Sequence, residues 1–224
     1  MDNPVRVATI SDLHGSLPDP VDADLCVIAG DIGPSTPLYH ADPNYAEDWL
    51  KEHFNDWLRS WNCPVAGLGG NHDFVFQWRP EVPESLDWAY LYHQPATVAG
   101  VSLWGSPWTP TFFDWAFMAP DEELEAFWSR IPPKVDLLAT HGPPRGILDI
   151  NSADVSCGSV SMKRWIDKAL PDALPQHHIF GHIHNPGGQS VRYRDTLFHN
   201  VACKDDRLRV RRGYKMLKIV PGAS

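Results

Sequence analysis

The chain has 224 residues, of which 43% are hydrophobic, and its formal net charge is −9. This length and hydrophobic share predict one globular domain, residues 1–224, with a substantial buried core. The acidic balance excludes a protein that binds nucleic acid through a broad basic surface, because such binding depends mostly on neutralising phosphates.

The sequence shows no feature of export or membrane insertion. Residues 1–6 run into an apolar stretch without the basic segment of a signal peptide, and no apolar run reaches membrane-spanning length. The cysteines are widely separated and form no Cys-x-x-Cys pair, which predicts reduced, mostly structural thiols. We therefore expect a soluble, cytoplasmic protein with no membrane partner. The four cysteines are Cys26, Cys63, Cys157 and Cys203.

Short apolar runs of β type occur along the whole chain and predict strands. Several are entirely apolar and are bounded by glycine or polar residues, which is typical of sheet strands covered on both faces. The predicted strands cover residues 5–10, 25–29, 64–68, 97–104, 135–139, 178–180, 196–201 and 214–220.

Amphipathic patterns between these runs predict helices. In residues 45–61, Phe54 and Trp57 share one face, and Glu47 and Lys51 share the opposite face. The alternation of strands and helices in the first two thirds of the chain predicts an α/β protein with layered sheets. The same helical pattern recurs over residues 121–131 and 159–170.

Polar residues of metal-ligand type directly follow five of the predicted strands. A single aspartate or histidine in such a place is commonly a turn former, a helix cap or a core residue. Five such segments in order are far less expected by chance than one. They can form a single site, because the carboxyl ends of strands in open α/β sheets converge on one crevice. The segments are Asp12-Leu13-His14, Gly30-Asp31, Gly70-Asn71-His72-Asp73, His141-Gly142 and Gly181-His182-Ile183-His184.

These motifs, in this order, resemble the signature of the calcineurin-like metallophosphoesterases, and they span most of the chain. The resemblance implies an α/β fold, a four-layer β-sandwich flanked by helices, with two metals at one end of the sheets. It assigns one metal to Asp12, His14, Asp31 and His184, and the other to Asp31, Asn71, His141 and His182.

This ligand set fits two divalent transition-metal ions. The carboxylate of Asp31 can offer one oxygen to each ion, as two-metal sites require. Imidazole with carboxylate and amide oxygens suits manganese, iron, zinc or nickel better than calcium, and the absence of thiolate argues against a closed structural zinc site. We expect manganese, with iron, zinc or nickel as alternatives.

Two adjacent ions would lower the pKa of a bridging water and supply a hydroxide in line with the phosphorus. By the resemblance, His72 is a catalytic histidine outside the coordination sphere that stabilises the transition state or protonates the leaving alkoxide. We expect Asp73 to orient or charge that imidazole, with a structural ion pair as the alternative.

The residues after Asp31 distinguish branches of the family. Ser/Thr protein phosphatases carry an aspartate three positions after the Gly-Asp pair, where this chain has Pro34, and the tyrosine of purple acid phosphatases is also absent. Residues 105–110 and 140–144 resemble the small metallophosphoesterase domain-containing proteins, which look like phosphodiesterases for small substrates, cyclic nucleotides among them. We therefore expect a small-molecule phosphodiester as substrate.

Two residues outside the motifs are candidates for substrate binding. Trp108 lies in a proline-rich loop and could stack on a nucleobase, although core packing is the commoner role of Trp104, Trp108 and Trp115. Arg145 follows His141 by four residues and would meet a phosphate or lie on the ordinary surface. We assign no role to His199.

Two other functions remain open from the sequence. A metallonuclease acting on DNA or RNA would use the basic residues between 207 and 218, but their alternation with Leu208 and Val210 favours the solvated face of a terminal strand. A non-catalytic binding module on the same fold usually loses metal ligands or the Asn-His pair, and here Asn71 and His72 are both present.

Overall fold

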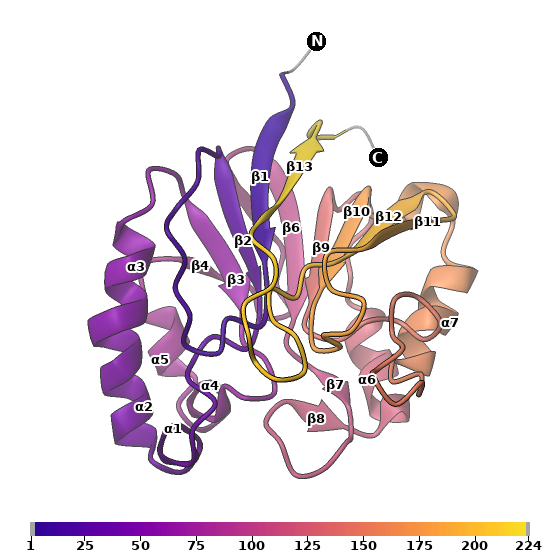
Figure 1. Ribbon diagram of the computed structural model, residues 1–224. Helices are drawn as coiled ribbons and strands as arrows, with labels where there is room; N and C mark the ends of the chain where they lie inside the picture. The colour runs from indigo at the N-terminus through magenta and orange to yellow at the C-terminus, as the bar shows by residue number, and fades with distance from the viewer. Residues whose placement is uncertain (1–2, 223–224) are drawn as a thin grey trace.

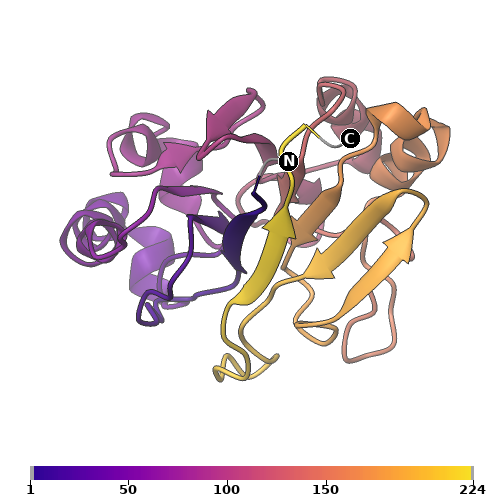
Figure 2. The same cartoon turned by 90° about the horizontal axis from the view of Figure 1, so that it is seen from above.

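The computed structural model describes residues 3–222. Within this range two β-sheets lie face to face, and helices cover their outer faces (Figures 1 and 2). The order of layers is helices, sheet, sheet, helices. The predicted four-layer β-sandwich of the α/β class is confirmed.

The first sheet of the described chain has five strands, in the order β13 (Lys215–Ile219), β1 (Val5–Ile10), β2 (Leu25–Ala29), β3 (Val65–Leu68) and β4 (Ala89–Tyr90). Strands β1 to β4 are parallel, and β13 adds an antiparallel edge. The sequence predicted β1 and β2 with the same bounds and β3 and β13 within one residue at each end.

The second sheet between residues 3 and 222 has six strands, in the order β11 (Ser190–Tyr193), β12 (Thr196–Asn200), β10 (His177–Phe180), β9 (Leu137–Thr140), β6 (Val101–Ser106) and β5 (Ala96–Val98). Its four central strands are parallel, and β5 and β11 are antiparallel edges. The single strand predicted over residues 97–104 is a hairpin of β5 and β6, because Gly100 at φ +81° turns the chain.

Helices over the first sheet come from the first half of the chain. The predicted helix over residues 45–61 is α2 (Pro43–Trp49), a π-helical turn η1 (Leu50–Phe54) and α3 (Asn55–Arg59). Shorter helices α1 (Pro37–Ala41), α4 (Phe74–Trp78) and α5 (Glu81–Glu84) were not predicted. Over the second sheet lie α6 (Asp121–Trp128), α7 (Val160–Lys168) and the 3₁₀ turn η2 (Pro171–Ala173), and a small parallel pair, β7 (Thr109–Pro110) and β8 (Met118–Ala119), lies beside α6.

Alternate residues of the apolar strands enter different cores. In β1, Val7 packs between the two sheets, whereas Ala8 faces α2 and α3. In β9, Leu137 packs between the sheets and Leu138 faces α6 and α7. A strand buried on both faces needs an apolar residue at every position, which explains the continuous apolar runs in the sequence.

The carboxyl ends of β1, β2, β3, β9 and β10 lie at the same end of the sandwich (Figure 1). The two sheets are joined there, because Ser11 pairs with Ala202 and its N–H donates to the carbonyl of Val201 at 3.0 Å. The loops that leave both sheets are therefore held against each other, and these loops carry the predicted metal ligands.

The basic residues near the C-terminus lie elsewhere than expected. Arg209 and Arg211 belong to a loop before β13, and their guanidinium groups bind the carboxylate of Asp205 at 2.9 Å. Of the basic residues between 207 and 218, Lys215 and Lys218 lie on the strand. The prediction that the whole stripe is a strand face is wrong, because Asp205 holds the arginines in a turn.

All four cysteines are free, as predicted. In the described range, no helix combines the length and apolar character needed to cross a bilayer.

A buried histidine in the second sheet has a defined tautomer. The hydroxyl of Thr140 donates to the carbonyl of Gly142 at 2.7 Å, so Nε2–H of His178 must be the donor to that hydroxyl at 2.8 Å. The remaining Nδ1 of His178 is buried and has no hydrogen-bond partner. Burial lowers the pKa of His178 to about 3, because a proton on Nδ1 would find no acceptor there.

We predict that protonation of His178 weakens the fold at acid pH. Its pKa is lower in the folded than in the unfolded chain, so its contribution is complete above pH 6.5 and is lost as pH falls towards 3. Between pH 7 and 5, the free energy of unfolding should fall about 2 kcal/mol more in the native protein than in His178→Leu. Urea denaturation at each pH, with a metal chelator present, measures the free energy of unfolding of both proteins. An equal decrease in the native protein and in His178→Leu would contradict the prediction.

Candidate metal centre

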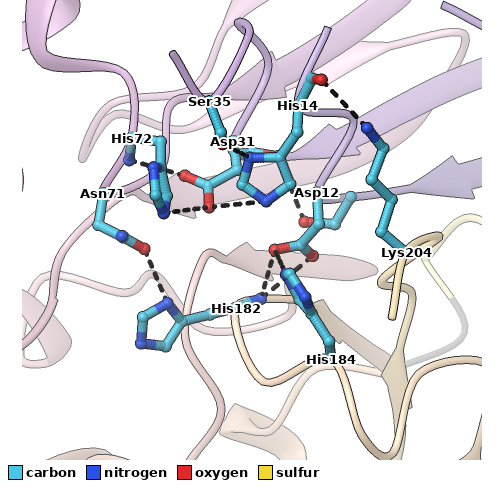
Figure 3. Close-up of polar contacts among 12 residues, drawn as sticks. Asp12, His14, Asp31, Ser35, Asn71, His72, His182, His184 and Lys204 are labelled. Carbon is cyan, nitrogen blue, oxygen red and sulfur yellow. Dashed lines mark hydrogen bonds and ion pairs between the residues drawn. The ribbon is translucent and has the colours of Figure 1, made fainter. Parts of the chain in front are cut away.

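The seven predicted metal ligands converge at the carboxyl ends of the two sheets. Asp12 and His14 follow β1, Asp31 follows β2 and Asn71 follows β3, so these four come from the first sheet. The other three come from the second sheet, and Figure 3 shows side chains of both groups pointing toward one another. From the second sheet, His141 follows β9, and His182 and His184 follow β10.

Asp31 lies between two groups of ligands. Its Oδ1 is 3.4 Å from Nε2 of His141, and its Oδ2 is 3.6 Å from Nε2 of His14. The two oxygens of one carboxylate therefore face histidines of different sheets. This is the arrangement that a ligand shared by two ions requires.

Each group contains further ligand atoms at short range. On one side, Oδ1 of Asn71 is 2.8 Å from Nε2 of His141 and 2.7 Å from Nδ1 of His182. On the other side, Nε2 of His184 is 3.1 Å from Oδ1 of Asp12. The assignment predicted from the family motif therefore corresponds to two clusters in space that share Asp31.

Partners outside the clusters fix the orientation of two imidazoles. Nδ1–H of His141 donates to the carbonyl of Ala29 at 2.9 Å, and Nδ1–H of His184 donates to the carbonyl of Asp205 at 3.1 Å. In both rings Nε2 is then the nitrogen that faces the cluster. Metal-binding histidines are commonly held in this way, through a hydrogen bond from the other nitrogen.

His14 supplies the clearest sign that the site suits a metal. Its Nδ1 is 2.6 Å from the hydroxyl of Ser35, and the carbonyl of His14 accepts from the ammonium of Lys204 at 3.1 Å (Figure 3). Its Nε2 is buried without a hydrogen-bond partner and faces Asp31. A buried nitrogen without a partner is costly unless an ion completes its coordination. The donor set of imidazole, carboxylate and amide oxygen fits divalent transition metals.

Charged groups are concentrated in the cluster that contains Asp12, His14 and His184. Burial opposes ionisation of Asp12, but the neighbouring His184 outweighs it and lowers the pKa of Asp12 to about 2. Burial likewise disfavours protonated His184, but the attraction of Asp12 raises the pKa of His184 to about 9. For His14 burial dominates and lowers the pKa to about 4. The carboxylates are thus ionised at neutral pH, which attracts cations.

The backbone is strained at the ligands. Asp12, His14, Asp31 and His182 all have positive φ, at 58°, 41°, 54° and 65°. Residues with a side chain rarely adopt this region, and such strain persists only where surrounding structure enforces it. The sharp turns after the strands direct the four side chains into one site.

Glycines provide the space for the carboxylates. A Cβ atom at Gly70 would collide with the carboxylate of Asp31, and one at Gly181 would collide with that of Asp12. The glycines that precede Asn71 and His182 in the motifs are therefore required by close approach between loops of different strands.

Comparisons with known proteins agree with this geometry. The family model for calcineurin-like phosphoesterases matches residues 5–186. The human and mouse metallophosphoesterase domain-containing protein 1 are each 29% identical to the chain over 230 aligned positions, which cover 88% of this chain and 66% of the relative. A dimetal phosphatase from Danio rerio has a similar structure, with a TM-score of 0.54, 11% identity, and coverage of 97% of this chain and 96% of that one.

The chain belongs to the calcineurin-like phosphoesterase family, and the human and mouse relatives support the predicted metallophosphoesterase domain-containing branch. The aligned segment is slightly less than two thirds of the length of the human and mouse relatives.

The two predicted catalytic residues, His72 and Asp73, have different surroundings in the structure. His72 faces the site, with Nε2 4.0 Å from Oδ2 of Asp31, and its backbone N–H donates to Oδ1 of Asp31 at 2.9 Å. Asp73 instead accepts backbone N–H groups of Ile32, Gly33 and Gly70 at 2.8–3.1 Å. Its carboxylate is saturated by the backbone, so the expectation that Asp73 orients the imidazole finds no support in the geometry.

His40 occupies the place expected of Asp73. Its Nε2 is 3.2 Å from Nδ1 of His72, and the two ring centroids are 5.0 Å apart. Sequence reasoning missed His40 because it belongs to α1, a helix that no pattern predicted. A histidine six residues after the Ile32-Gly33-Pro34 turn was the only available signal.

The two predicted substrate contacts lie outside the cavity beside the ligands. The indole of Trp108 is half-buried against Phe117 and Phe127, and its N–H donates to Tyr92 at 3.3 Å. Arg145 is exposed in the loop after β9. Substrate binding by Trp108 and by Arg145 therefore stays a prediction. The aromatic residues that do line the cavity are Phe112, Phe113 and Trp115.

We predict that Asp31→Asn loses metal from both clusters, because the amide removes the shared charge and one of the two acceptor oxygens. Metal analysis after manganese loading should find two ions per native chain and fewer than one per Asp31→Asn chain. Asp114→Asn, in the exposed loop near the site, is the matched control and should retain both ions. Full occupancy in Asp31→Asn would contradict the shared role.

Proposed function

We propose that this protein is a phosphodiesterase for small phosphodiesters, with cyclic nucleotides as the candidate substrates. The observation that supports the proposal is the convergence of the seven predicted ligand side chains, four of which line one small cavity together with the imidazole of His72. The cavity of about 210 Å³ opens directly over Asp31 and Asn71. A larger hollow of about 480 Å³, lined by Leu17 and Arg212, contains none of the predicted ligands.

The ligands fit two divalent ions, for which we propose manganese. When bound, the ions would supply Lewis-acid activation of water and of the phosphoryl oxygens. In this proposal the protein itself supplies a positioned proton donor. His72 lines the cavity, and its backbone N–H donates to Asp31, so in this proposal its Nε2 is placed beside the reacting phosphodiester.

His40 would set the tautomer of His72. With Nε2–H of His40 donating, Nδ1 of His72 accepts, and Nε2 of His72 carries the hydrogen that faces the cavity. That hydrogen is the one that the leaving alkoxide needs. The ring of Trp115, with its centroid 4.3 Å from that of His72, covers the imidazole from the loop side and restricts its rotation.

Several observations favour a small substrate over a nucleic acid. Arg209 and Arg211 are paired with Asp205, and no residue between 207 and 213 lines the cavity within the described chain. A nuclease needs a row of free cations along the phosphate backbone. The unbroken ligand set disfavours a non-catalytic binding module. Free cysteines fit a reducing compartment, and we propose the cytoplasm.

The first test of the proposed function compares substrates and His72. Manganese-loaded protein should hydrolyse bis(p-nitrophenyl) phosphate and 2′,3′-cyclic AMP faster than p-nitrophenyl phosphate or single-stranded DNA. His72→Asn should lower kcat for the diesters by about 10²- to 10⁴-fold, the usual contribution of a general acid, without lowering metal content. Rapid DNA cleavage, or full activity of His72→Asn, would overturn this assignment.

A second test addresses His40 as a positioning residue. His40→Leu should lower kcat for bis(p-nitrophenyl) phosphate about tenfold, the order expected from losing one orienting hydrogen bond, with little change in KM. His40→Gln, which can still donate a hydrogen bond, should recover most of the loss. His53→Leu removes an exposed histidine of η1 and is the matched control. Equal losses in the leucine and glutamine variants would argue for a packing role alone.

A further inference from the structure

The loop between β7 and β8 carries two unusually exposed aromatic side chains. Phe113 is 73% exposed, more than any other large hydrophobic side chain of the described residues, and Phe112 is 61% exposed. Both line the cavity over the metal ligands, together with Trp115. We call Phe112, Phe113 and Trp115 the aromatic lip. Apolar surface left in water beside a reactive centre costs free energy and marks a binding surface.

Backbone hydrogen bonds hold the loop in place. The N–H of Thr109 donates to Phe117 at 2.9 Å, and the N–H of Ala116 donates to the carbonyl of Asn71, a predicted metal ligand, at 3.1 Å. Phe113 itself has a strained φ of 61° at the turn. The aromatic lip is thus fixed relative to the metal centre, and the strained turn directs its outermost ring into solvent.

The three rings of the aromatic lip lie close to one another or to His72 along the lining of the cavity. The centroids of Phe112 and Phe113 are 4.3 Å apart at 53°, and the ring of Trp115 lies against His72. A group bonded to the oxygen that His72 protonates would lie next to Trp115 and extend towards the two phenylalanines. The space beside the aromatic lip therefore suits the organic part of a phosphate ester, whereas the phosphoryl group would lie at the metal ligands.

The charge and size of the cavity limit what that organic part can be. Within residues 3–222 the lining includes no lysine or arginine, so no fixed cation would bind a second phosphate. The volume of about 210 Å³ is below the roughly 300–1,000 Å³ of pockets that enclose a drug-sized molecule. One uncharged planar ring system fits these limits better than a dinucleotide or a polyphosphate.

We propose that the aromatic lip is a substrate subsite that stacks one planar ring system, the size of a nucleobase, attached to the scissile phosphodiester. The proposal rests on the proposed function and narrows it to mononucleotide-like esters without further phosphates. Stacking of a base on aromatic side chains contributes about tenfold to a hundredfold in affinity.

The test compares two ligands that differ in the base. 2′,3′-Cyclic AMP and glycerol 1,2-cyclic phosphate are both five-membered cyclic diesters, and their manganese-dependent hydrolysis can be followed by phosphorus NMR. In Phe112→Leu/Phe113→Leu, KM for the nucleotide should rise at least tenfold more than KM for the glycerol compound. Tyr45→Leu, at an exposed aromatic residue of α2 that does not line the cavity, is the matched control.

A binding measurement separates the subsite from the reaction. Calorimetry should show weaker binding of adenosine 5′-monophosphate to the double variant than to the native protein, with a much smaller change for glycerol 1-phosphate. If native protein hydrolyses neither cyclic diester but shows this difference, the subsite stands and the proposed function fails. Hydrolysis with equal changes for both ligands overturns the subsite and leaves the function. Absence of both hydrolysis and nucleotide binding overturns both.

Discussion

The carboxylate of Asp31 is the feature on which the site depends. It is 2% exposed, and its two oxygens face His14 from one sheet and His141 from the other. Removing a buried carboxylate from water is costly unless cations or hydrogen-bond donors compensate. The imidazoles lower the pKa of Asp31 despite its burial, and a backbone N–H from His72 adds a hydrogen bond. The ligand clusters are arranged around this single ionised group.

The sandwich places that carboxylate by joining loops of two parallel sheets. Parallel strands bring their carboxyl ends to one end of the fold, and the strained turns after β1, β2 and β10 aim the ligands inward. Asp73 locks this arrangement, because its carboxylate joins the loop after β2 to the loop after β3 through Ile32, Gly33 and Gly70. Burial and the nearby Asp31 raise its pKa to about 7. Its contacts make it a structural part of the site.

Residues that would tune the reaction lie outside the metal motifs. His40 comes from the short helix after β2, and the aromatic lip comes from the loop between β7 and β8. Both meet at His72, whose ring lies 5.0 Å from that of His40 and 4.3 Å from that of Trp115, centroid to centroid. A constant metal centre on rigid strand ends, with loops that differ in composition, allows one fold to serve different substrates.

The sequence determined most of the longer strands, because these depend on local pattern, and the motifs at the strand ends predicted the ligand set through their resemblance to a family. Continuous apolar runs such as 25–29 defined strands, and the ligands directly follow them. Strand β11 (Ser190–Tyr193) was not predicted, because every residue in it is exposed and its sequence shows no hydrophobic periodicity. Only the tertiary structure decided that His40 contacts His72, 32 positions away, and that Asp73 binds the β2 loop. Such contacts depend on how separate loops fold back over the sheet ends, and no local pattern encodes that geometry.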